Sequence, residues 1–216
     1  MHATKHSHLT AIALLALSLT VSAQTQSKPV TKPASKPAAP STDDSQLYRN
    51  TSFGFRFQIP YSWVDRSKQM QEGTEAGKSE LLLAVFERPP GATGDTVNSA
   101  VVIASESAAT YPGFKRAGDY LGPLGDLASG KGFKAEGEAY MLDVEGRQLL
   151  RADFVKTLPG KTTDDKLTMR QCTLVLLAKG QIVSFTFIAG SEEELDELMD
   201  GLHFGASKSR TRKNRP

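Results

Sequence analysis

One stretch of the chain has a glycine and lysine spacing that could bind phosphate. Gly125, Gly130 and Lys131 have the separation used by phosphate-binding loops, in which backbone N–H groups and the lysine hold the phosphates. Gly132, however, stands where such loops need Ser or Thr to bind magnesium. The segment also follows a helical pattern and precedes a strand pattern, whereas a phosphate loop joins a strand to a helix. We therefore interpret it as the glycine-rich end of a helix.

Carboxylate pairs are a second group of residues that could do chemistry, as a general acid and base or as calcium ligands. Asp164 and Asp165 are adjacent in a predicted loop, and Glu136 and Glu138 lie two apart on a predicted strand. Calcium needs more oxygen ligands than either pair supplies. Acidic residues at alternate strand positions are typical of a solvated face. We predict exposed surface here, and a hydrolase that works through carboxylates remains an alternative function.

The remaining reactive side chains are few. Cys172 is the only cysteine, so no intramolecular disulfide can form, and nothing beside it in sequence would lower its thiol pKa. His203 is the only histidine after residue 23, and we expect it at the end of the last helix, where a cation is favoured. Trp63, beside Tyr61, either lines a ligand pocket or, as we expect, seals an edge of the core. We predict no catalytic, cofactor-binding or metal-binding residue, and no cofactor.

The C-terminal segment 206–216 has an unusual charge. Residues 46 to 206 hold 17 Lys and Arg against 22 Asp and Glu, a net charge of −5, whereas the last ten residues carry five cations. These are Lys208, Arg210, Arg212, Lys213 and Arg215. We predict a basic, disordered tail that either contacts an anionic lipid or envelope polymer, at about 1 kcal/mol per cation near an anionic membrane, or only keeps the chain soluble. Nucleic acid is not an expected partner because no aromatic residue is interleaved to stack on bases.

The N-terminal residues 1–23 have the features of a secretory signal: Lys5, an apolar run from Leu9 to Leu19, and small residues up to Ala23. The run is shorter than the roughly 20 apolar residues that a membrane-spanning helix needs. We predict cleavage after Ala23, export to the periplasm or the external medium, and no transmembrane segment in the mature chain. Residues 24–45 repeat Lys-Pro every four residues, which predicts an extended linker.

Residues 46–205 are long enough for one domain. Alternating apolar residues and glycine or proline turns predict an antiparallel sheet of about six to seven strands. The predicted strands are 53–59, 80–87, 97–106, 133–142, 147–157, 167–178 and 181–189. The last strand is apolar on both sides, so we expect both faces of the sheet to be covered.

Two predicted helices are candidates for that cover. The first runs from Phe114 to Ala128 and is kinked or broken by glycine and Pro123. The second begins at a capping box formed by Ser191 and Glu194 and carries one apolar stripe of leucine and methionine, which we interpret as core.

The two ends of the domain carry a family pattern. Tyr48 to Trp63 contain a Tyr-x-Asn lead-in, a Gly-Phe-x-Phe-x-Ile-Pro strand and a tryptophan three residues later. Ser191 to Phe204 form a capped helix that ends in Leu-x-Phe. The chain from about 46 to 205 therefore resembles the PsbP-like family. The resemblance implies an α+β sandwich with a central antiparallel sheet flanked by helices, and protein binding without catalysis.

These patterns lead to one main functional hypothesis and two alternatives. The main hypothesis is an exported, non-catalytic PsbP-like module that binds or helps to assemble an unknown envelope protein. The first alternative is an envelope-associated hydrolase that uses carboxylates. The second is a protein that attaches to the envelope electrostatically through its basic tail.

Overall fold

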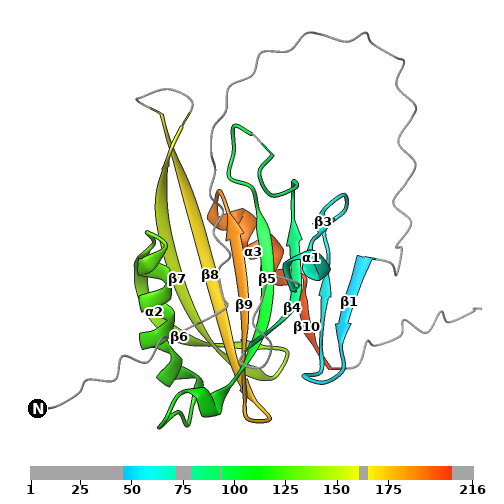
Figure 1. The fold of residues 1–216 in the computed structure, drawn as a ribbon, viewed down its shortest axis with the longest axis vertical. Coiled ribbons are helices and arrows are strands. Elements are labelled where there is room, and N and C mark those ends of the chain that lie inside the picture. Colours follow the sequence, from blue (N-terminus) through cyan, green and yellow to red (C-terminus); the bar gives the residue numbers. More distant parts are fainter. Residues whose placement is uncertain (1–45, 72–78, 93, 161–164, 206–216) are drawn as a thin grey trace, which may run out of the picture.

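The computed structural model describes residues 46–71, 79–92, 94–160 and 165–205. The predicted signal peptide at 1–23, linker at 24–45 and basic tail at 206–216 lie outside these residues, as does Asp164. The described residues form an α+β sandwich built on two antiparallel sheets (Figure 1). The fold class is therefore the one that the sequence predicted.

The larger sheet contains seven strands in the order β3-β4-β5-β9-β8-β7-β6. All of its neighbouring strands are antiparallel. Their bounds are β3 Val64–Asp65, β4 Ser79–Phe86, β5 Ala100–Ser107, β6 Lys134–Val144, β7 Arg147–Pro159, β8 Lys166–Ala178 and β9 Gln181–Ala189. The six predicted strands from residue 80 onwards correspond to β4 to β9, with bounds that differ by a few residues.

The smaller sheet has the strand order β1-β2-β10. The helices lie in the connections between strands of the two sheets. Its strands are β1 Leu47–Asn50, β2 Phe55–Gln58 and β10 Leu202–Phe204. The helices are α1 Ser67–Gln71, α2 Leu121–Gly130 and α3 Glu192–Asp200, with short 3₁₀ helices at Ala108–Thr110 (η2) and Ala117–Tyr120 (η3). The β1, β3, β10 and α1 elements were not predicted, because segments of two to five residues carry too little periodicity.

Both faces of the large sheet are covered, as the pattern of β9 predicted. On one face, α3 and the smaller sheet pack against the fully buried Phe185 and Phe187 of β9. On the other face, α2 packs through Leu124 and Ala128. Met70 of α1 covers β4 on that face. A second sheet therefore supplies part of the cover that the sequence assigned to helices alone.

The opening strand begins later than predicted. Its pattern covers 53–59, but β2 begins at Phe55 because residues 51–54 form a turn. Gly54 has a φ of +73°, and its N–H donates to the carbonyl oxygen of Asn50 at 2.9 Å. Glycine adopts this conformation without the strain that a Cβ would impose. Phe55 and Phe57 still point into the core, as the alternation requires.

The first predicted helix is broken, and the second is capped differently. The segment 114–128 contains η3 followed by α2, with Pro123 in the first turn of α2, where a backbone N–H has no helical partner to lose. In α3, the Ser191 hydroxyl accepts a hydrogen bond from Glu194 N at 3.2 Å, as predicted. The Glu194 carboxylate turns instead to Gly190 N at 3.1 Å. The predicted α3 stripe is core, since Leu195 and Leu198 are buried.

Candidate functional site

Strand β6 forms one border of the seven-stranded sheet. It is eleven residues long, and most of its side chains are exposed. Among the residues that the structure describes, β7 is the only strand that pairs with it, so its outer side has no strand neighbour. An edge strand of this kind presents backbone N–H and C=O groups that another strand can bind. The geometry of β6 is therefore that of a candidate docking strand.

A bulge divides β6 into two parts. Glu136 pairs with Asp153 and Tyr140 pairs with Arg151, so three residues of β6 face one residue of β7. Gly137 has a φ of +72° within this bulge. A bulge twists an edge and interrupts regular pairing. The regular part of the edge is therefore the segment from Tyr140 to Val144, which ends at the β6–β7 turn.

This regular part carries exposed apolar side chains. Tyr140 is 47% exposed and Met141 is 52% exposed, and with Tyr61 at 85% they are the large apolar residues that stand out on the described surface. The guanidinium carbon of Arg151 lies 5.8 Å from the centre of the Tyr140 ring. Tyrosine and arginine are common in the energetic centres of protein interfaces.

An ion pair fixes Arg151 beneath the edge strand. Its Nε donates to the two carboxylate oxygens of Asp153 at 2.9 and 3.1 Å. Burial acts to lower the pKa of Arg151, but the hydrogen bond to Asp153 and the negative charge of Asp153 act against it, and the pKa lies above its ordinary value. The arginine therefore remains charged, and it presents a fixed cation to the Tyr140 ring.

Cys172 lies on the same side of the sheet and is fully buried. Its thiol donates to the sulfur of Met199 at 3.4 Å. Burial raises the pKa of the Cys172 thiol, the negative charge of Asp153 adds to this, and Arg151 opposes it to a smaller extent. The thiol is therefore protonated and packed in the core, which confirms the prediction of a buried cysteine.

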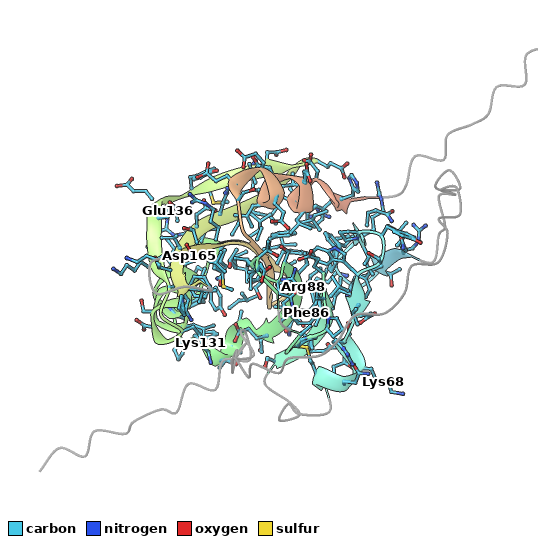
Figure 2. All side chains as sticks on the ribbon, turned by 90° about the horizontal axis from the view of Figure 1, so that it is seen from above. Lys68, Phe86, Arg88, Lys131, Glu136 and Asp165 are labelled. Atoms are coloured by element: carbon cyan, nitrogen blue, oxygen red, sulfur yellow. The ribbon has the colours of Figure 1, made fainter. Side chains whose placement is uncertain are left out.

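The predicted carboxylate pair on β6 is exposed. Glu136 accepts a hydrogen bond from Arg170 at 2.6 Å, and the same arginine lies 3.2 Å from Glu192 of α3. Figure 2 shows Glu136 at the border of the molecule. Glu138 stands in the bulge and is also exposed. The prediction of a solvated face is confirmed, with the addition that Glu136 links the edge strand to α3 through Arg170.

The β6–β7 turn is attached to the smaller sheet by Glu145. Its carboxylate accepts from the backbone N–H of Phe204 at 2.7 Å and lies 3.1 Å from Nδ1 of His203. These interactions, with the backbone hydrogen bond first, lower the pKa of Glu145. His203 is a residue of β10 and not of the last helix, because α3 ends at Asp200, so its predicted position was wrong. Its partner is a carboxylate and not helix carbonyls.

A second polar cluster lies at the far end of β5. The hydroxyls of Tyr111 and Tyr120 both donate to the carboxylate of Glu106, the former at 2.7 Å. Burial is the first cause that raises the pKa of each tyrosine, and the Glu106 carboxylate raises both further. The rings of these tyrosines and of Phe114 pack with centroids 4.9 to 6.0 Å apart. The cluster anchors the segment before α2 and uses both oxygens of the carboxylate.

The other predicted residues have structural positions. The segment from Gly125 to Gly130 lies within α2, and the carbonyl oxygen of Lys131 accepts from Lys156 at 2.8 Å, which confirms a helix end. Trp63 packs against the core, as expected, whereas Tyr61 points to solvent. Asp165 is exposed, and its backbone oxygen accepts from Gly160 N.

Two further observations concern the described residues only. They contain no cluster of three or more His, Cys, Asp or Glu side chains arranged to hold a metal ion. No helix among them is long and apolar enough to cross a membrane. The five cations of the predicted electrostatic site lie in 206–216, outside the described residues.

Sequence reasoning missed the bulge and the border position of β6. Gly137 within a predicted strand was the available signal, because glycine inside a strand often marks a bulge. The pairing of Tyr140 with Arg151 had no such signal, since it depends on the register between two strands.

The chain is similar in fold to several solved structures. No protein-family model and no curated protein matches the sequence. Cyanobacterial PsbP (CyanoP) from Synechocystis is 16% identical with a TM-score of 0.46, covering 78% of this chain and 98% of that protein. LpqN from Mycobacterium tuberculosis, described as involved in cell envelope biogenesis, is 15% identical with a TM-score of 0.40, covering 70% and 83%. The Ran-binding protein Mog1p from Saccharomyces cerevisiae is 10% identical with a TM-score of 0.43, covering 73% and 94%.

The chain resembles these three structures in fold, at low sequence identity.

Proposed function

We propose that this protein is an exported, non-catalytic binding module of the cell envelope. It binds an extended segment of an envelope protein, which adds a strand to the outer side of β6. In this mode of recognition, main-chain hydrogen bonds supply affinity and alternate side chains supply specificity.

The observation that carries the proposal is the open β6 edge with Tyr140 and Met141 exposed on it. The two side chains point to opposite faces of the sheet because they are neighbours on a strand. An added strand would thus be contacted on both faces, by an aromatic ring on one and a flexible thioether on the other. Arg151 and Asp153 support the aromatic side rigidly.

The described carboxylates support binding rather than hydrolysis. Glu106, Asp153 and Glu145 each accept hydrogen bonds from tyrosine, arginine or backbone N–H donors. Hydrogen bonds lower the pKa values of the Asp119, Glu145 and Glu193 carboxyls. A general acid needs a raised pKa.

The compartment is inferred from the N-terminal sequence. Lys5, the apolar run from Leu9 to Leu19 and the small residues up to Ala23 support export and cleavage. The basic residues of 206–216 support an additional electrostatic contact with an anionic surface.

The test is affinity capture of partners from detergent-solubilised envelope with the chain from residue 24 onwards. A Tyr140→Ser, Met141→Ser double variant should lose the specific partner by about tenfold or more, because interface centres of this kind contribute over 1 kcal/mol per residue. Tyr61→Ser is the matched control, since it removes an exposed tyrosine elsewhere and should leave capture unchanged. Equal capture by native chain and double variant would contradict the proposal, provided that both show the same thermal unfolding.

A further inference from the structure

We propose that the basic C-terminal segment 206–216 occupies the outer side of β6 in the same chain, and that a partner must displace it. This inference concerns the regulation of the docking strand and rests on the proposed function. Three observations support it: where the described chain ends, how long the remaining segment is, and how its charge compares with that of β6.

The described chain ends beside β6. Gly205 follows β10, and its position is set by a hydrogen bond from its N–H to Gly54 O at 3.0 Å and by Arg56, which donates to its carbonyl oxygen at 3.0 Å. The preceding residue, Phe204, donates to Glu145 in the β6–β7 turn at 2.7 Å. The segment 206–216 therefore starts at the turn where β6 ends.

Length and direction are compatible with pairing. Strand β6 runs from Lys134 to Val144, towards the turn. A segment that starts at the turn and follows the strand runs in the opposite direction, so the pair would be antiparallel. Eleven residues extend to about 36 Å at 3.3 Å per residue, which equals the length of β6.

The charges are complementary. The exposed charged residues of β6 are three acids, Glu136, Glu138 and Asp143, and one base, Lys134. In the segment, Lys208, Arg210 and Arg212 alternate with Ser209 and Thr211, so an extended chain would present these three cations on one side.

This charge pattern also selects among occupants. Opposite charges across a strand pair are each worth about 0.2–1 kcal/mol, whereas like charges directly opposite are destabilising. A second copy of β6 would bring three more acids to this edge, so the pattern disfavours edge-to-edge dimers. A partner strand that displaces the tail would have to meet the same acids, so its recognition segment should be extended and cationic.

The test compares hydrogen exchange of β6 amides in two forms of the chain from residue 24 onwards, the native form and a Lys208→Glu, Arg210→Glu, Arg212→Glu variant. At low salt, β6 amides should exchange about tenfold or more slowly in the native form, because the added backbone hydrogen bonds and the attraction between the cations and the acidic strand protect them. About 0.5 M salt should remove most of this difference. Lys28→Glu, Lys32→Glu, Lys36→Glu is the matched control, with the same charge change in the linker.

Equal β6 exchange in the native form and the tail variant at low salt would overturn the inference. If the linker control weakened protection as much as the tail variant, net charge and not pairing would be the cause, which would also overturn it. A different result would contradict the proposed function: equal capture of the partner by the native chain and by the Tyr140→Ser, Met141→Ser variant. Slow exchange that depends on the tail, together with increased partner capture by the tail variant, would support both.

Discussion

The two borders of the seven-stranded sheet differ in length and exposure. Strand β3 has only two residues, Val64–Asp65, and leads directly into α1, whose Ser67 hydroxyl accepts a hydrogen bond from Ala84 N of β4 at 2.8 Å. Strand β6 has eleven residues; helix α2, which precedes it in the chain, contacts it, but no described strand pairs with its outer side. Short or covered edges prevent unwanted strand pairing. The border at β3 is therefore closed, and the border at β6 is open.

A third edge, that of β10, is protected in another way. The Glu145 side chain takes the N–H of Phe204, so a carboxylate stands where a further strand would pair. In β6 the protection is limited to the bulge at Gly137 and the acids beside it. One side chain is therefore enough to block the β10 edge, whereas the regular part of β6 has no such block among the described residues.

The largest expected effect separates the sheet centre from this open border. Phe185→Ala removes a fully buried ring of β9 and should lower the free energy of unfolding by about 3–5 kcal/mol. Met141→Ala on β6 should change it by less than about 0.5 kcal/mol, because the side chain is half-exposed. Urea unfolding measures both. A large loss at Met141 would mean that the border residue serves stability and not binding.

Removing the bulge should open the border further. Deleting Gly137 and Glu138 leaves one β6 residue opposite Ala152 and restores regular pairing between Glu136 and Tyr140. The longer flat edge should cause self-association, because it presents an unbroken row of backbone groups. Light scattering after size-exclusion chromatography measures the mass, with Glu138→Gln as a control that keeps the bulge. A variant that stays monomeric at high concentration would show that the bulge does not protect the edge.

The ion pair beneath Tyr140 should have an intermediate effect. Asp153→Asn removes the charge partner of Arg151, whose side chain is 19% exposed, and should cost about 1–2 kcal/mol of unfolding free energy. It should also speed amide exchange in the regular part of β6, because Arg151 no longer has a fixed position. Asp126→Asn, at an exposed site on α2, is the control and should change neither quantity. Unchanged β6 exchange would show that this cluster does not hold the border.

The smallest effect concerns the protected edge of β10 and depends on pH. Hydrogen bonds from Phe204 and His203 lower the pKa of Glu145 in the folded state. A lowered pKa contributes stability above the unfolded value, near about 4.3, and this stability is lost as pH falls through the folded value. The melting temperature of the native chain should therefore exceed that of Glu145→Gln at pH 7, and the difference should shrink below about pH 4. A difference that stays constant from pH 7 to about 3 would contradict this account.

Features that depend on residues close in sequence were predicted well, and features that depend on contacts between distant segments were not. Strands β4 to β9 and helix α3 were predicted because alternation, turns and capping residues are local signals. The predicted strand at 53–59 lost its first residues to a glycine turn. The helix predicted from 114 begins only at Ala117, as the 3₁₀ helix η3 that leads into α2. The position of His203 was wrong because the chain leaves α3 early to form β10 beside β2.

The candidate site was less predictable than the fold. Tyr140 and Met141 were within a predicted strand, but nothing local shows that this strand lies at a border. The pair formed by Arg151 and Asp153 was also not recognised. These residues lie two apart on one strand, and their link to the edge depends on the contact between Arg151 and the Tyr140 ring of the neighbouring strand.

Residue types and their spacing were enough to predict the antiparallel α+β class, the burial on both faces of β9, and the solvated character of Glu136 and Glu138. These properties depend on residue types at spacings of two to four, which a strand or helix converts directly into faces. The strand order, in which β9 lies between β5 and β8 and β6 lies at the border, became known only from the folded structure. The same holds for the protection of β10 by Glu145, since that contact joins residues 59 positions apart. Faces are local properties of a chain, whereas neighbours and free edges result from pairing between distant segments.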